Sequence, residues 1–87
     1  MRRDGRIVRG GITVDGFSFN IVEEIAVLSC RAPYSTELNV VSFDDAYPKY
    51  DIRRWRTEDG VKHPAKGCQL GRAEMRVLRD ALNKMVL

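Results

Sequence analysis

The hydrophobic period of this chain changes at Gly71, and this change constrains the fold more than any other feature of the sequence. Before Gly71, apolar and polar residues alternate with the period of two that is typical of β-strands. After it, the three- and four-residue spacing of an amphipathic helix runs through RAEMRVLRDALNKMVL. The sequence therefore predicts an α+β fold in which antiparallel strands, joined by short turns, precede one C-terminal helix.

Four strands are expected before the helix, over residues 17–30, 36–43, 49–56 and 66–70. In the third of these, period two places Tyr50 and Ile52 on one face. The opposite face then carries Lys49, Asp51, Arg53 and Trp55, and we expect it to be exposed to solvent. The first sixteen residues are rich in Gly and Arg and hold few apolar side chains, so a flexible basic arm is expected there, before a domain over residues 17–87.

Size and composition limit the kinds of protein that this chain can be. Its 87 residues fit one domain with a thin core, which a partner chain would help to stabilise. The sequence has no run of apolar residues long enough for a membrane span or a signal peptide, so a cytoplasmic protein is expected. Cys30, Cys68 and His63 lack the close pair of ligands that structural zinc requires, so neither a metal nor another cofactor is expected. No catalytic motif is present, and we expect the protein not to be an enzyme.

The predicted helix has more apolar surface than a sheet alone can cover. Its apolar residues span about half of the circumference, whereas a helix that lies on a sheet needs a stripe of about 100°. Association with a second copy of the chain is the simplest way to bury this additional apolar surface. We therefore expect a homodimer whose interface includes Met75, Leu78, Leu82 and Met85.

Positive charge is concentrated in one part of the chain. Residues 48–79 hold nine Lys and Arg residues against four acidic residues, although the net charge of the whole chain is only +3. If the second and third strands pair, Phe43 and Trp55 share a face with Lys49 and Arg53. Cations attract phosphates and flat rings stack on unpaired bases, so this face is typical of a site for single-stranded nucleic acid. A solvated sheet face, with Arg53 paired to a carboxylate, is the other interpretation.

Three segments, in this order, resemble a known family: ELNVVSFDDAYPKYDIRRW, KGCQL and RAEMRVLRDAL. They are similar to the transcriptional positive cofactor 4 family, and most closely to its bacterial YdbC-like branch. The shared pattern is a strand that ends in an aromatic residue, then DIR with a nearby Trp, a basic loop, KGxxL and a helix with an acidic first turn. The resemblance covers residues 17–87 and implies a ββββα protomer with a curved sheet, which dimerises through its helices and holds single-stranded DNA in grooves with little sequence preference.

The resemblance also implies which residues contact the nucleic acid. On matching positions these are Phe43, Arg53, Trp55, Lys66 and Gly67, and less closely Tyr34 in the first hairpin. Two positions depart from the family pattern, since Cys68 replaces an aliphatic residue and Gly71 replaces a Ser or Thr helix cap. Three further basic residues, Lys49, Arg54 and Arg56, complete the expected set, although Arg54 and Arg56 share the parity of Ile52 and reach the same face only if the strand bends.

The sequence thus predicts a DNA-binding homodimer that coats single-stranded DNA during transcription, replication or repair. Such a protein would be associated with the nucleoid and would act as a transcriptional coactivator or regulator. Single-stranded RNA is the alternative nucleic acid, because stacking and phosphate contacts scarcely distinguish the sugars. An alternative of another class is a dimeric interaction module whose basic face docks an acidic partner protein.

Overall fold

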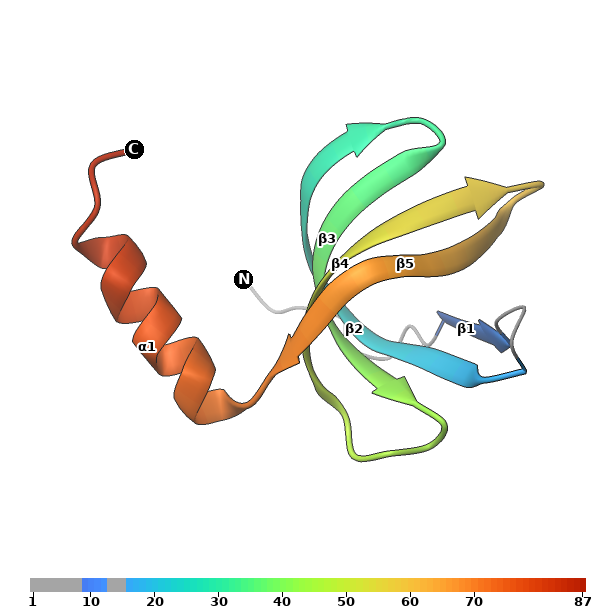
Figure 1. The fold of residues 1–87 in the computed structure, drawn as a ribbon, viewed down its shortest axis with the longest axis horizontal. Helices are drawn as coiled ribbons and strands as arrows, with labels where there is room; N and C mark the ends of the chain where they lie inside the picture. Colours follow the sequence, from blue (N-terminus) through green and yellow to red (C-terminus); the bar gives the residue numbers. More distant parts are fainter. Residues whose placement is uncertain (1–8, 13–15) are drawn as a thin grey trace.

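A computed structural model describes residues 9–12 and 16–87, which form five strands and one helix (Figure 1). The elements are β1 (Arg9–Ile12), β2 (Ser18–Arg31), β3 (Tyr34–Phe43), β4 (Lys49–Glu58), β5 (Val61–Leu70) and α1 (Arg72–Asn83). All strands pair antiparallel in the order β1-β2-β3-β4-β5, so each strand pairs only with its neighbours in sequence. The four predicted strands followed by a helix are confirmed.

Two stretches differ from the prediction. Residues 1–8 and 13–15 of the expected arm lie outside the described residues, but Arg9–Ile12 form β1 and pair with the first residues of β2. The fourth predicted strand begins five residues earlier than expected, because the segment before it is no loop. Asp59 and Gly60 both have positive φ and make a tight turn, after which β5 pairs with β4 from Val61 onward.

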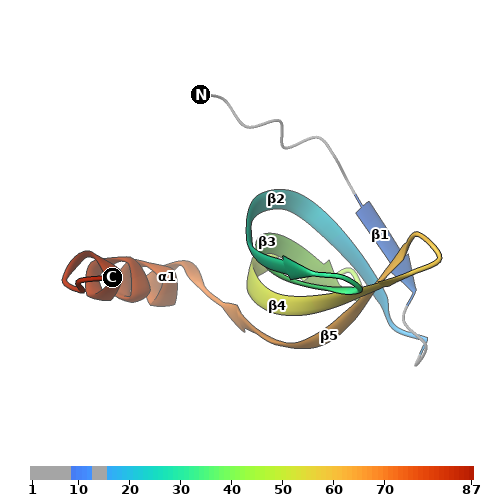
Figure 2. The same ribbon diagram turned by 90° about the horizontal axis from the view of Figure 1, so that it is seen from above.

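The sheet is strongly curved, and β2 is the strand that bends most. Its pairing with β3 shifts register three times between Ile21 and Ser29. Each shift of this kind inserts an unpaired residue, which bends the strand and increases its twist. The strands consequently form a strongly curled sheet, as the view from above shows (Figure 2).

The concave face of this curl holds the core. Phe19, Ile21, Val41 and Trp55 are its buried apolar residues, and Trp55 is 0% exposed. Period two assigned Trp55 to the correct face, but the expectation that this face is open to solvent is wrong for Trp55. The curvature closes the sheet over its own concave side, so that the middle of this face becomes the interior of the protomer.

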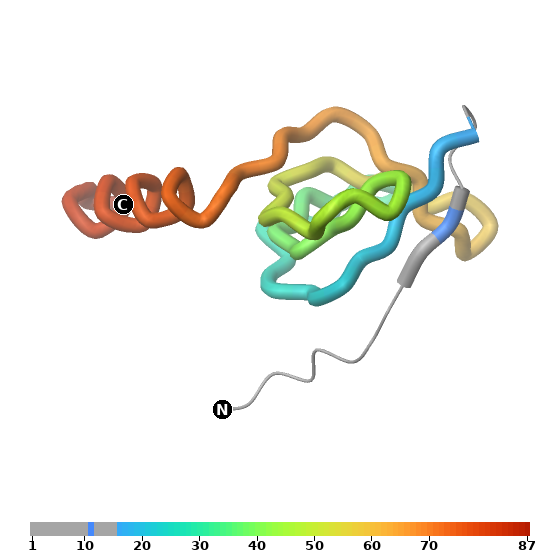
Figure 3. Tube along the Cα trace, turned by 90° about the horizontal axis from the view of Figure 1, so that it is seen from below, coloured from blue at the N-terminus to red at the C-terminus, as the bar shows by residue number. Residues whose placement is uncertain are grey.

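The helix α1 stands away from the sheet (Figures 1 and 3). It begins after Gly71, whose backbone N–H donates a hydrogen bond of 2.8 Å to the Glu74 carboxylate in the first turn. It ends at Asn83, so the last four residues of the predicted helix lie beyond it. None of its residues is buried. Within the described part of the chain, no helix is long and apolar enough to cross a membrane.

Candidate nucleic-acid interface

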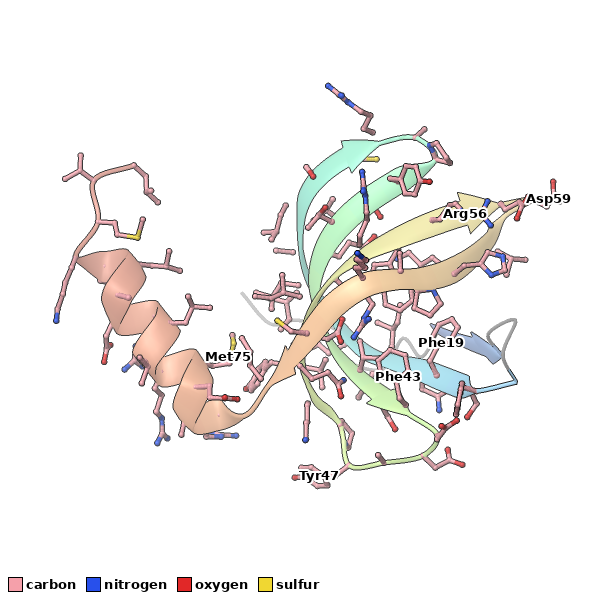
Figure 4. All side chains as sticks on the ribbon, in the orientation of Figure 1. Phe19, Phe43, Tyr47, Arg56, Asp59 and Met75 are labelled. Carbon is pink, nitrogen blue, oxygen red and sulfur yellow. The ribbon has the colours of Figure 1, made fainter. Side chains whose placement is uncertain are left out.

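Three aromatic rings from different strands meet on the concave face. Phe19 lies with its ring centroid 5.3 Å from Trp55 and 6.5 Å from Phe43. Figure 4 shows Phe19 and Phe43 close together in the space that the strands enclose. Trp55 is at the covered end of this cluster, whereas Phe43 is only partly buried. Phe43 is therefore the ring of the expected set that an unpaired base can reach on this face without a rearrangement.

Arg53 lies beside Phe43 but is already engaged. Its Nε and Nη2 atoms donate to the Asp51 carboxylate at 2.9–3.2 Å, and Nη1 donates to the Ala65 carbonyl at 2.8 Å. Its guanidinium carbon is 4.9 Å from the centroid of Phe43. Asp51 is fully buried, so this ion pair compensates a carboxylate that would otherwise be stranded in the core. Arg53 is thus paired with a carboxylate, but with one on its own strand two residues earlier and not with one on a neighbouring strand.

The close pairing of β4 and β5 explains why residue 67 is a glycine, which the sequence did not reveal. Gly67 lies opposite Arg53 in the register of β4 and β5, and a Cβ at this position would come within 2.6 Å of the Arg53 Cβ and of the Ile52 carbonyl oxygen. The absence of a side chain lets β5 approach Arg53 closely. Lys66 and Ala65 lie in the adjacent register shift, opposite Arg54, and Lys66 is exposed.

Lys62 and Glu37 form an ion pair across the concave face. The Lys62 ammonium lies 2.8 Å from Glu37 Oε1 and 5.5 Å from the centroid of Trp55. Glu37 is 5% exposed and also accepts hydrogen bonds from Ser35 and Asn39. Burial raises the pKa of the Glu37 carboxyl, but these hydrogen bonds and the charge of Lys62 outweigh burial and hold the pKa below its ordinary value. Glu37 is consequently ionised at neutral pH.

The ion pair separates two hollows of the concave face. One, of about 330 Å³, is lined by residues 24–27 together with Glu37, Asn39 and Lys62. The other, of about 580 Å³, lies under the β2–β3 hairpin and is lined by Val27, Cys30, Ala32, Pro33, Tyr34, Ser35, Glu37, Thr57 and Lys62. Because Val27, Glu37 and Lys62 line both hollows, the two form consecutive parts of one groove, which we call the concave groove.

Three of the other expected contact residues, Tyr34, Arg54 and Arg56, lie on the outer face of the sheet. Tyr34 pairs in register with Arg31 and with Arg56, and Arg54 pairs with Thr36, so these side chains share the convex side. Arg54 and Arg56 keep the parity of Ile52 and therefore do not join Phe43 and Arg53, although the pairing of β4 with β5 shifts register between Arg53 and Trp55. Lys49 is exposed and has the parity of Arg53, at the start of β4.

Sequence reasoning did not pair Lys62 with Glu37 and did not include Glu37 or Arg31 in these surfaces. Lys62 and Glu37 lie on strands that are not neighbours in the sheet, and Lys62 fell in a segment expected to be a loop. Only the correct β4–β5 register brings it to Glu37. Arg31 follows the first predicted strand, and its charge seemed isolated in an acidic part of the chain. In the structure it stands opposite Tyr34 and joins the basic residues of β4.

No family model matches the sequence. The chain is 37% identical over 79 residues to a protein of Treponema pallidum (strain Nichols) that is described as uncharacterized. The matched region covers 90% of this chain and 91% of the relative.

Proposed function

We propose that this chain, which belongs to the same protein family as the Treponema pallidum relative, is a homodimer that binds single-stranded DNA without sequence preference. It acts by binding and not by catalysis. We place it in the cytoplasm, associated with the nucleoid, where it supports transcription, replication or repair as a coactivator or regulator. The resemblance to the positive cofactor 4 family agrees with this function.

The observation that carries the proposal is the concave groove with its neighbouring rings. The groove is open to solvent, and Lys62 connects it to the aromatic cluster by its position over Trp55. Phe43, with the Arg53 guanidinium stacked on it, offers a flat cationic platform beside Lys49. Stacking of a base on such a platform is worth about 1–3 kcal/mol and tolerates every base. Duplex DNA hides its bases, so a groove of this kind favours single strands.

Lys62 links phosphate binding to the aromatic cluster. A phosphate in the groove competes with Glu37 for the Lys62 ammonium, which has two N–H donors beyond the one that Glu37 accepts. Movement of Lys62 away from Glu37 would uncover Trp55, which is buried in the free protomer. On this proposal Phe43 contacts the strand first, and Trp55 joins the contact only when Lys62 moves.

The proposed homodimer explains why α1 has an exposed apolar stripe. Val77, Leu82 and Met85 are 71%, 45% and 54% exposed, and the half-buried Met75 and Leu78 belong to the same apolar stripe. A protomer with this thin core leaves the stripe in water, at a cost of about 25 cal/mol for each Å² of apolar surface. Association of two helices buries the stripe and, in the dimer, doubles the number of grooves.

Fluorescence anisotropy with labelled oligo-dT, oligo-U and duplex DNA tests the function. We expect oligo-dT to bind more tightly than the duplex, with an affinity that falls as salt rises by about 0.7 logarithmic units per neutralised phosphate. Replacement Phe43→Leu should weaken binding about tenfold or more, since one stacked base is lost. Equal affinity for duplex and single strand would refute the stacking argument, and tighter binding of oligo-U would replace DNA by RNA as the ligand.

A further inference from the structure

The outer face of the sheet carries a basic hollow that lies across the β2–β3 hairpin from the concave groove and shares three lining residues with it. It has a volume of about 360 Å³ and lies over the β2–β3 hairpin and the adjacent part of β4. We call it the outer basic hollow, and it is lined by Ser29, Cys30, Arg31, Tyr34, Ser35, Thr36 and Arg54. No Asp or Glu is among the residues that line it, so its two guanidinium groups give it a net charge of +2.

The cations of the two faces differ in whether a carboxylate neutralises them. On the concave face, Arg53 is paired with Asp51 and Lys62 with Glu37. Among the residues that the structure describes, no carboxylate lies within ion-pair distance of Arg31 or Arg54. An anion that reaches the outer basic hollow therefore meets uncompensated charge, whereas the charges of Arg53 and Lys62 on the concave face are already compensated by a carboxylate.

Aromatic and hydroxyl groups give this hollow further features of a nucleic-acid contact. The Arg54 guanidinium carbon lies 4.4 Å from the centroid of Tyr34, and Tyr34 remains 37% exposed. A guanidinium and a phenol stacked in this way present flat surfaces to a base, while the guanidinium edge still donates to phosphate. Ser29 and Thr36 add hydroxyl donors. An acidic peptide would use the charges but would have no use for the flat surfaces.

We propose that the outer basic hollow binds the sugar–phosphate backbone of single-stranded DNA as the strand leaves the concave groove over the β2–β3 hairpin. Cys30, Tyr34 and Ser35 line both this hollow and the larger hollow of the concave groove, so the two sites are separated only by the hairpin itself. The inference rests on the proposed function. The two faces then have different roles. The concave groove supplies aromatic rings, and the outer basic hollow supplies guanidinium groups that have no carboxylate partner.

Two oligonucleotide lengths and two matched double variants test the inference. We compare oligo-dT of about 5 and about 16 nucleotides, which are near the limits for one small sheet domain. The variant Arg31→Ala, Arg54→Ala removes the charge of the hollow. The control Arg72→Ala, Arg76→Ala removes the same charge from exposed positions of α1. Binding is measured by anisotropy over a series of salt concentrations, together with binding of poly-glutamate.

For the wild type, we expect the longer oligonucleotide to show the tighter binding and the steeper salt dependence. The Arg31 and Arg54 variant should lower the salt slope for the longer oligonucleotide by about 1.4, which corresponds to two phosphates, and leave the shorter one unchanged. An equal loss in both double variants, or no loss in either, would overturn the inference and leave the proposed function intact. A loss that affects only poly-glutamate would overturn it in favour of an acidic protein partner. A wild type that binds neither oligonucleotide would refute the proposed function, and this inference with it.

Discussion

Lys62 and Glu37 join two strands that are not neighbours in the sheet. Lys62 lies on β5 and Glu37 on β3, and their 2.8 Å ion pair spans β4, where Trp55 lies beneath the ammonium. The ion pair therefore fixes the curvature of the sheet at its middle and covers the largest side chain of the core. A small domain with four buried apolar residues in its described part depends on such a cross-link more than a larger domain would.

The ion pair should contribute strongly and non-additively to stability. Lys62→Met leaves the buried Glu37 carboxylate without its cation, and we expect a loss of about 3 kcal/mol in the free energy of unfolding. The double variant Lys62→Met, Glu37→Leu removes both charges and should lose much less. Urea unfolding followed by circular dichroism measures both. Losses that simply add, with the double variant the least stable, would show that the two residues act independently.

The stability of the protein should fall at acidic pH through Glu37. Its pKa is lowered in the folded state, so its contribution is fully present above the unfolded pKa of about 4.3 and is lost as pH falls through the folded value. The midpoint of thermal unfolding, followed from pH 6 downward, should decrease below about pH 4. Glu37→Gln should be less stable at pH 6 and should flatten this acidic decrease. An unchanged acidic decrease in this variant would assign the effect to other carboxyls.

Gly67→Ala should destabilise the sheet, because a Cβ there collides with backbone atoms that cannot rotate away. The nearest contacts are 2.6 Å to the Ile52 carbonyl oxygen and 2.7 Å to the Arg53 Cα. We expect a loss of about 3 kcal/mol, at the upper end of overpacking effects. The control is the exposed neighbour Lys66→Ala, which should change stability by less than about 0.5 kcal/mol. Comparable losses in the two variants would contradict the close approach of β5 to Arg53.

The fluorescence of Trp55 should report its burial directly. We expect a blue-shifted emission that acrylamide quenches weakly in the free protein, since the side chain is 0% exposed. Binding of oligo-dT should itself quench the Trp55 emission, because a base contacts the ring once Lys62 has moved, as the proposed function requires. Trp55→Ala should cost about 3–5 kcal/mol of stability, as for other large core residues, so that its effect on binding cannot be separated from unfolding. A red, readily quenched emission from the free protein would place Trp55 outside the core.

A charge on the apolar stripe of α1 should separate the protomers. Sedimentation at micromolar concentration should give a dimer for the wild type and a monomer for Leu82→Glu. Asn83→Glu adds the same charge at the neighbouring position and should leave the dimer intact. A wild type that sediments as a monomer would refute the homodimer in the proposed function.

Sequence periodicity predicted the strands, the helix and the face of each β4 side chain, because parity depends only on the chain itself. It could not tell which face is buried. Which face is buried depends on the curvature of the sheet. This curvature arises from register shifts in β2, which no single residue of the sequence indicates. Trp55 was therefore assigned to the correct side but to the wrong environment.

Of the candidate site, Phe43 and Arg53 lie on the same face, as their parity predicted. Their contact also requires the curvature of the sheet, because Arg53 is paired in register with Glu37. The partner of Arg53 and the role of Gly67 required the exact neighbours across β4 and β5. Arg54 and Arg56 were included for their charge, although their parity already placed them with Ile52, and Tyr34 was included through the resemblance. The structure places all three on the outer face. The dimer stripe follows from helical period, and its exposure in the protomer agrees with that prediction without testing it.

The simple order of the strands has a consequence for synthesis of the protein. Each of β2 to β5 pairs with the segment that the ribosome released just before it, so successive hairpins can close while the rest of the chain is still being made. The helix α1 follows all five strands in the sequence. In the proposed homodimer, the strands of each chain are therefore released before the segment through which two copies associate.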